Sequence, residues 1–180
     1  MDDTISLIDL GEIILDGGNV VKTPYHVIMT EKIFEENRHI DSDRLIARIE
    51  EAFQTEVLLV PWLGPKYDTF GHTDGLVRYI KDKDLLMDNY TVFDKAKAKQ
   101  LYKALEGKGY TVHELELPYG YDYSWAYINF LQTYKVIVMP KFGLKPMSTQ
   151  ISISVHYLIC QLYKYQHHTS SKNMAVRSTA

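Results

Sequence analysis

One spacing constrains the fold of this 180-residue chain more than any other feature: a polar residue recurs every 55 positions, as Asn19, Asp74 and Asn129. A fixed period of this size is typical of arrays of repeated supersecondary units. After each of the three residues the pattern indicates a strand, a short turn and a second strand. These strands are predicted at residues 20–22 and 27–30, 76–80 and 85–87, and 130–132 and 136–139. We therefore expect the three polar side chains to lie on one common side of the array.

The first two repeats continue into a helix and a closing strand, so the predicted unit is ββαβ and the predicted fold class is α/β (α+β). Asp41 and Asp94 are suitable N-caps for the two helices. Each helix has an apolar face, formed by Leu45, Ile46, Ile49 and Phe53 in the first and by Ala98, Leu101, Tyr102 and Leu105 in the second. Glycines at 107 and 109 end the second helix. The closing strands are predicted at 56–60 and 110–115, where His113 is expected to face solvent.

Composition narrows the class of protein. A hydrophobic content of 46% is enough to bury the core of one domain, and a net charge of −3 gives no electrostatic footprint for nucleic acid. The single cysteine excludes an internal disulfide. No run is apolar enough to span a membrane and the start carries no signal pattern, so we predict a cytoplasmic protein without membrane or nucleic-acid partners. The pair His167 and His168 has no further metal ligand at suitable spacing, so no metal site is predicted.

The segment 68–78 has the character of a catalytic loop. It places His72 and Asp74 between Gly71 and Gly75, directly ahead of an apolar run. If residues 72–74 are extended, the imidazole and the carboxylate point the same way, so that a proton-transfer group and an anionic clamp meet one substrate. A polar turn with a solvated histidine is the competing interpretation, and the triplet alone does not separate the two.

Three motifs in order resemble those of the guanidino-group-modifying enzymes. They are Leu-Asp-Gly-Gly-Asn at 15–19, Asp-x-x-Gly-His-x-Asp-Gly-x-x-Arg-Tyr at 68–79, and Tyr-x-Asn-Phe at 127–130 ahead of the strand and Pro-x-Phe-Gly at 136–143. Within that superfamily the chain is similar, over about residues 5–145, to agmatine deiminases and bacterial-type peptidylarginine deiminases. The resemblance implies a pentein fold, a five-bladed α/β propeller of ββαβ modules. A full ring at this period needs roughly 275 residues, so we expect an incomplete, open propeller whose exposed edge favours oligomerisation.

The resemblance also implies a chemistry without a cofactor. A cysteine thiolate attacks the carbon of a small-molecule or peptidyl guanidine, ammonia leaves, and water releases the ureido product. His72 would be the general acid and base, and Asp74 the catalytic carboxylate that also binds the substrate. Asn129 would orient the substrate or the histidine. Asn19 and Gly18 would contribute to substrate binding, mainly through close approach of the backbone. In agmatine deiminases this reaction belongs to putrescine biosynthesis.

Two elements of the family pattern are missing from the sequence. An upstream Trp-x-x-Arg-Asp type segment and a Gly-Gly-x-x-x-Cys motif do not occur, and Cys160 lies in an apolar stretch that favours a buried, inert thiol. We therefore expect a deiminase domain at 1–146, truncated at its N-terminus, and an aberrant or poorly ordered tail at 147–180. Reading the codons of residues 172–180 two bases further on can spell Lys-His-Gly-Gly-Ala-Leu-Asn-Cys, which suggests a frameshift.

Three hypotheses follow for function. The chain is a guanidino hydrolase present as a partial and inactive copy, a guanidino-binding remnant without catalysis, or an interaction module on the same propeller fold. The repeat is compatible with all three, whereas the Gly-His-x-Asp loop favours the first two. The sequence leaves open which guanidine is the substrate.

Overall fold

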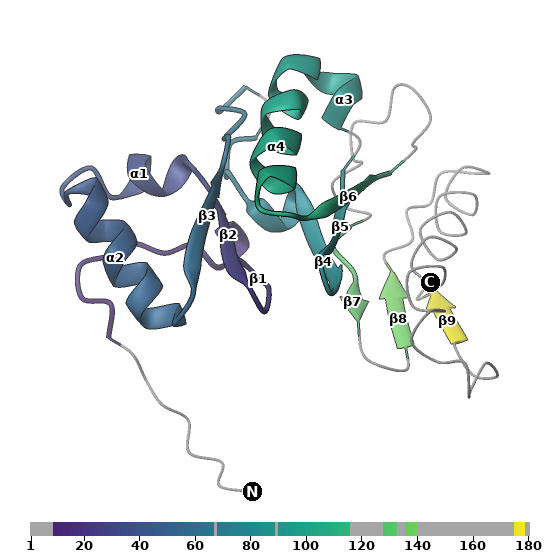
Figure 1. The fold of residues 1–180 in the computed structure, drawn as a ribbon, viewed down its shortest axis with the longest axis horizontal. Coiled ribbons are helices and arrows are strands. Elements are labelled where there is room, and N and C mark those ends of the chain that lie inside the picture. Colours follow the sequence, from purple (N-terminus) through teal and green to yellow (C-terminus); the bar gives the residue numbers. More distant parts are fainter. Residues whose placement is uncertain are drawn as a thin grey trace, which may run out of the picture.

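The chain forms three small sheets in a row, one for each predicted repeat (Figure 1). This architecture comes from a computed structural model, which describes residues 9–66, 68–88, 90–115, 128–132, 136–139 and 175–178. Every sheet has three strands in the order in which they occur along the chain. The first two strands pair antiparallel, and the third pairs parallel with the second. The mixed α/β class and the repetition are thus confirmed.

The first two units have the predicted ββαβ order. The first consists of a 3-10 turn η1 (Gly17–Asn19), β1 (Val21–Lys22), β2 (His26–Thr30), α1 (Lys32–Glu36), α2 (Ser42–Phe53) and β3 (Glu56–Val60). The second consists of η2 (Thr73–Gly75), β4 (Val77–Lys81), β5 (Asp84–Met87), α3 (Tyr90–Phe93), α4 (Lys95–Gly107) and β6 (Thr111–Glu114). The short helices α1 and α3 were not predicted, because four or five residues carry no helical periodicity that a sequence can show.

The third unit contains β7 (Leu131–Gln132), β8 (Val136–Met139) and β9 (Ala175–Ser178). Strands β7 and β8 match the predicted strand pair. Strand β9 lies in the segment 147–180 for which we expected an aberrant tail, and it pairs parallel with β8 as a closing strand. The rest of that segment, including Cys160, lies outside the described residues.

The two long helices begin where the sequence predicts. The Asp41 carboxylate accepts hydrogen bonds from the backbone N–H groups of Asp43 and Arg44, and Asp94 caps α4 in the same way. These bonds satisfy amide groups that have no partner inside the helix. Among the described residues, no helix has the length and apolarity needed to cross a membrane.

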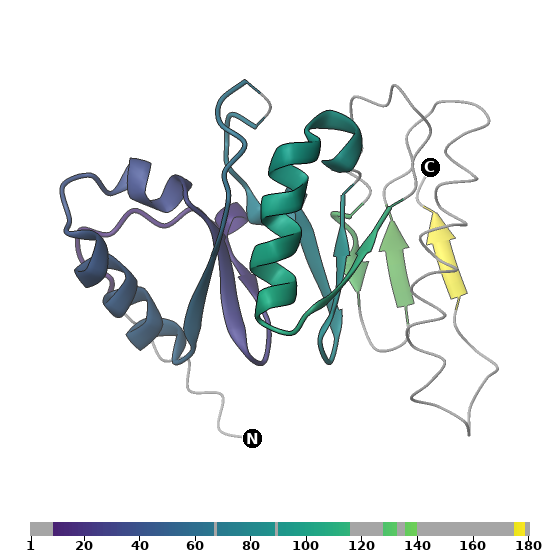
Figure 2. The same cartoon turned by 45° about the horizontal axis from the view of Figure 1, so that its top comes forward.

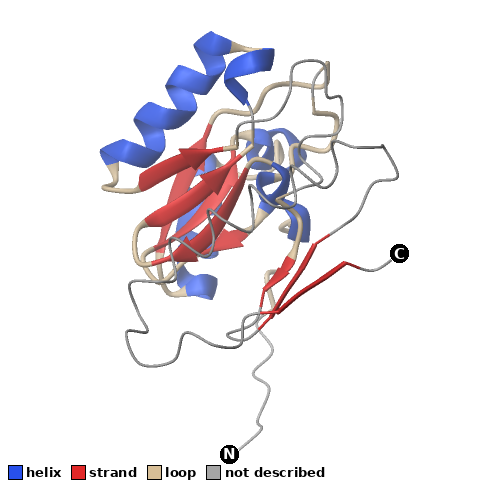
Figure 3. Cartoon of the chain, turned by 90° about the vertical axis from the view of Figure 1, so that its right-hand side faces the viewer, coloured by secondary structure: helices blue, strands red, loops and turns tan. Residues whose placement is uncertain are grey.

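The sheets and helices form alternating layers (Figure 2). One face of the first sheet packs on α1 and α2 through Val27, Met29, Ile33, Leu45, Ile49 and Val57. Its other face packs on the second unit, in a core cluster that includes Val21, Ile28, Leu58, Val60, Leu101 and Leu105. In Figure 3 the strands lie side by side and a long helix runs along them. The first sheet is therefore enclosed between its own helices and helix α4 of the next unit.

A buried polar cluster joins the two units at the turn end of the sheets. Nδ1 of His26 lies 2.9 Å from the hydroxyl of Tyr110, which also contacts Oγ1 of Thr23 at 2.8 Å. Nε2 of His26 lies 3.6 Å from Oε2 of Glu56. Nζ of Lys83 lies 4.6 Å from the centre of the Tyr110 ring, a cation–π contact. Because these residues come from both units, the cluster couples the packing of one unit to the other.

This cluster predicts a loss of stability in mild acid. Burial lowers the pKa of His26 below its ordinary value of 6.5, although Glu56 opposes the shift. The folded state therefore binds this proton less readily than the unfolded state. The contribution of His26 to the free energy of unfolding is fully present above about pH 6.5 and is lost as the pH drops below that value. Urea unfolding at pH 7.5 and 5.5 should show the loss, and His26→Gln should reduce it.

His113 differs from the expectation of a solvent-facing residue. It is partly buried, and its Nε2 lies 2.9 Å from Oδ1 of Asp84 on the neighbouring strand. The pairing arises because β5 and β6 are parallel neighbours, which bring the two side chains to the same face. The short turn predicted between the strands at 76–80 and 85–87 is present between β4 and β5, with Asp82 in the left-handed region at φ 44°.

Candidate functional site

The candidate site lies where the 3-10 turns η1 and η2 of the first two units meet. Asn19 connects them. Its side chain is fully buried, and Oδ1 accepts hydrogen bonds from Thr30 N and Thr73 Oγ1, both at 2.7 Å, and lies 2.9 Å from Thr30 Oγ1. The amide oxygen is thus occupied by protein donors. The substrate-binding role predicted for Asn19 stays a prediction, and the structure gives the residue a task in holding the two turns together.

His72 lies beside this junction and bridges the units. Its Nε2 is 2.8 Å from Oδ2 of Asp16, which comes from the start of η1. The other carboxylate oxygen of Asp16 accepts the backbone N–H of Gly18 at 3.0 Å. A carboxylate fixed in this way orients the imidazole.

Asp74 lies on the other side of the imidazole. Its Oδ1 is 4.0 Å from Nδ1 of His72, which is close enough for electrostatic attraction but too far for a hydrogen bond. The reason for their proximity differs from the prediction. His72 is extended, but residues 73–75 form a 3-10 turn, so the alternation of an extended strand does not apply. The turn sends Thr73 into the core and leaves Asp74 beside the histidine.

The two carboxylates have opposite electrostatic environments. The hydrogen bond from His72 holds the pKa of Asp16 below its ordinary value of 3.8, and the Gly18 amide acts in the same direction. Burial raises the pKa of Asp74 above that value, against the attraction of His72. Acidic groups whose pKa values are pushed apart in this way are suited to different roles around one proton-transfer centre.

Gly18 lies against the His72 ring, and Asn129 lies at the start of the third unit. A Cβ atom on Gly18 would lie 2.6 Å from ring atoms of His72, so the absence of a side chain admits the imidazole against the backbone. Asn129 is exposed at the start of the third unit. Its neighbour Phe130 is buried and lies 4.9 Å from Cζ of Arg78 on β4. Substrate binding by Gly18 and Asn129 stays a prediction.

Asp16 is the site residue whose role the sequence did not reveal. We expected the stretch 16–19 to act through its backbone, whereas the Asp16 side chain contacts His72 across 56 residues of sequence. Its only local signal is the acidic residue directly before Gly17 and Gly18, where it also caps η1. Among the described residues, no group of three or more metal-binding side chains is arranged to hold a metal ion.

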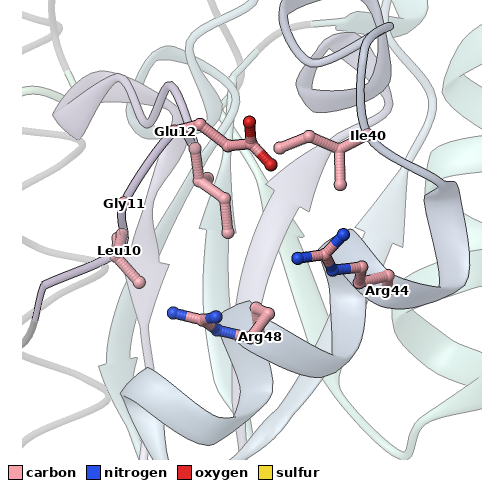
Figure 4. Close-up of a pocket in the computed structure, with 7 residues that line it drawn as sticks. Leu10, Gly11, Glu12, Ile40, Arg44 and Arg48 are labelled. Carbon is pink, nitrogen blue, oxygen red and sulfur yellow. The ribbon is translucent and has the colours of Figure 1, made fainter.

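A pocket of about 270 Å³ lies apart from this site. It separates residues 10–13 from α2, and its lining consists of Leu10, Gly11, Glu12, Ile13, Ile40, Arg44 and Arg48. Both arginine side chains extend from α2 toward the segment that carries Glu12 (Figure 4). The pocket shares no residue with the group of His72, Asp16 and Asp74.

A family model for the Porphyromonas-type peptidyl-arginine deiminases matches residues 3–155. The chain belongs to this family. The matched range of this peptidyl-arginine deiminase family member includes the whole candidate site. No curated protein gives a significant match.

Solved structures support the fold of this family member. An agmatine deiminase of C. jejuni is 17% identical, with a TM-score of 0.67 over 93% of this chain and 50% of the other. An agmatine deiminase of Enterococcus faecalis is 16% identical, with a TM-score of 0.66 over 93% of this chain and 52% of the other. The chain therefore spans about half the length of these structures, and at such identity they establish the likeness of the fold alone.

Proposed function

We propose that this chain carries part of the site of a guanidino hydrolase, which converts a guanidine and water into a ureido product and ammonia. One observation supports it most directly: the His72 ring contacts the carboxylate of Asp16 from the first unit and lies near that of Asp74 from the second. Membership of the peptidyl-arginine deiminase family supports the same reaction. The names of the solved relatives add agmatine to peptidyl-arginine as a candidate substrate.

Each residue has a distinct role in this proposal. Asp74 binds the planar guanidinium, and an arriving cation favours the ionised form of a carboxyl whose pKa burial has raised. His72 takes a proton from the attacking water and supplies one to the leaving nitrogen. Asp16 stabilises the imidazolium that exists between these steps. The nucleophile implied by the family resemblance is a cysteine thiolate, and no described residue is assigned to it.

We also infer that the three units are part of an α/β propeller with this site near its axis. The support is the repeated unit and the packing of the first sheet between its own helices and α4. The cytoplasmic location and oligomerisation through a propeller edge remain predictions from the sequence.

A second candidate is guanidine binding without hydrolysis. The observation that favours it is that His72, Asp16 and Asp74 come together within residues 16–74, without any contribution from a cysteine. The two candidates share the binding step and differ in turnover, so binding is the first property to measure.

Calorimetric titration of the chain tests the binding step. We expect agmatine and arginine amide to bind, whereas 1,5-diaminopentane, a cation without a guanidinium, should bind at least about tenfold more weakly, because it lacks the planar donors that pair with a carboxylate. Asp74→Asn should remove this preference. The control is Asp84→Asn, which removes a carboxylate beside His113 in the same unit and should leave guanidine binding intact. Equal affinity for the guanidines and the diamine would contradict the proposal.

A further inference from the structure

The segment that carries His72 is held by side chains of the first unit. We define residues 68–73 as the His72 loop. Thr30 Oγ1 donates to the carbonyl oxygen of Gly71 at 2.7 Å, and Thr73 Oγ1 donates to Asn19. Within the loop, Oδ1 of Asp68 accepts the backbone N–H groups of residues 70 and 71. The backbone is therefore fixed on both sides of the histidine.

Lys32 makes the most unusual of these contacts. Its Nζ donates to the carbonyl oxygen of Phe70 and forms an ion pair with Oε1 of Glu36 at 2.9 Å. The Lys32 side chain is only 15% exposed, although an unconstrained lysine on a short helix extends into water. Its stem lies directly under Gly71, where an added Cβ would be 2.3 Å from Cδ of Lys32. Gly71 has a φ of 65°, so both its conformation and its contact with Lys32 require glycine.

Two further observations connect Lys32 to the chemistry of the site. The hydrogen bond from His72 is the largest cause of the lowered pKa of Asp16, and the nearby positive charge of Lys32 acts in the same direction. The second oxygen of Glu36 is buried without a hydrogen-bond partner among the residues that the structure describes, so Lys32 provides its counter-charge. The lysine is thus a largely desolvated cation that touches the loop two residues before the histidine.

We propose that Lys32 is a positioning residue, which holds the His72 loop against the first unit and so keeps the imidazole on Asp16. The expected effect of Lys32 on guanidine binding rests on the proposed function. The position of His72 can be measured without any substrate. The competing role is purely structural, in which Lys32 only contributes to the stability of the fold.

The test compares Lys32→Met with Lys97→Met in the full chain. Lys97 is a matched control, because its Nζ also donates to a backbone carbonyl, that of Trp62, 2.7 Å away and ten residues before His72. Carboxyl and imidazole NMR signals report the site directly. For Lys32→Met we expect the Asp16 carboxyl to titrate at a higher pH and the His72 ring signals to shift, while Lys97→Met should change neither. Lys32→Arg, which keeps the charge and a donor, should restore the Asp16 titration at least in part.

A double variant separates positioning from folding. Lys32→Met/Glu36→Gln removes the lysine without leaving an unpaired buried carboxylate, which would itself destabilise the fold. It should fold and still show the altered Asp16 titration. The inference would be overturned if the double variant had the same Asp16 titration and the same His72 spectrum as the original chain.

Agmatine titration of the same variants measures the consequence for binding. Where the original chain binds agmatine, Lys32→Met should weaken it by about tenfold or more, since a histidine and carboxylate displaced by about 1 Å lose much of their effect. An original chain that binds no guanidine contradicts the proposed function alone, because the Asp16 titration still decides the role of Lys32. Unchanged agmatine affinity in Lys32→Met contradicts the positioning role.

Discussion

Asn19→Leu is expected to lower the free energy of unfolding by about 2–4 kcal/mol, because it leaves two buried donors without their acceptor and each costs about 1–3 kcal/mol unless it finds another. The donors are the amide of Thr30 and the hydroxyl of Thr73, whereas the Thr30 hydroxyl keeps the carbonyl oxygen of Gly71 as its acceptor. Leucine has the same number and branching of side-chain heavy atoms as asparagine, so the substitution creates no cavity. Urea denaturation at pH 7.5 measures it.

The control for this variant comes from the repeat itself. Asn129 occupies the corresponding place in the third unit and is exposed. Asn129→Leu should therefore change stability by no more than about 0.5 kcal/mol. If Asn19→Leu and Asn129→Leu lowered the free energy of unfolding by similar amounts, the loss could not be attributed to the buried hydrogen bonds of Asn19.

His72→Ala is expected to reduce ammonia release by about 10²–10⁴-fold in a chain extended to include the upstream carboxylate segment and the cysteine motif of the family. The reason is that no other described side chain near Asp16 and Asp74 exchanges protons readily near neutral pH. His113→Ala is the matched control, since it removes another histidine paired with an aspartate and should leave turnover unchanged. Colorimetric detection of ammonia from agmatine and peptidyl-arginine provides the measurement.

The present 180-residue chain should show no turnover in the same assay. The expected route passes through a covalent thioether, and the loss of a nucleophile removes many orders of magnitude in rate. If the chain releases ammonia and Cys160→Ser abolishes that release, the interpretation of Cys160 as an inert thiol is wrong. Sequencing the gene across and beyond the codons for residues 147–180 tests the suggested frameshift, which fails if no alternative frame ends in a Gly-Gly-x-x-x-Cys motif.

The features that the sequence predicted well are local or periodic. Asp41 and Asp94 define the starts of α2 and α4 because capping depends on neighbours within three residues. The closing strand 56–60 is a continuous run with strand-forming residues, and it was predicted to the residue. The repeat predicted that the strands of each unit are arranged alike, because units at equal spacing in the sequence are expected to share one topology.

The site was harder to predict because its decisive contacts cross between units. The sequence identifies His72 and Asp74 as neighbours, but the partner on the other ring nitrogen, Asp16, lies 56 residues away. Asn19 was interpreted as a substrate ligand from the family resemblance of the stretch 16–19, and it occupies the same repeat position as Asp74. In the fold, the first of these positions is buried under Thr30 and Thr73 and the second is not. Sequence periodicity reports equivalent backbone positions, whereas burial depends on which neighbour covers each one.

The enclosure of the first sheet between α2 and α4 has a consequence for synthesis on the ribosome. One face of that sheet can be covered as soon as its third strand, residues 56–60, has emerged, but its other face is not fully covered before residues 95–107. Until then Ile28, Leu58 and Val60 lack the apolar residues that α4 contributes to their cluster. Such an exposed face favours association with chaperones or other nascent chains. We therefore expect the smallest stretch that folds cooperatively during translation to include one unit and the helix of the next, so that folding lags behind each completed repeat.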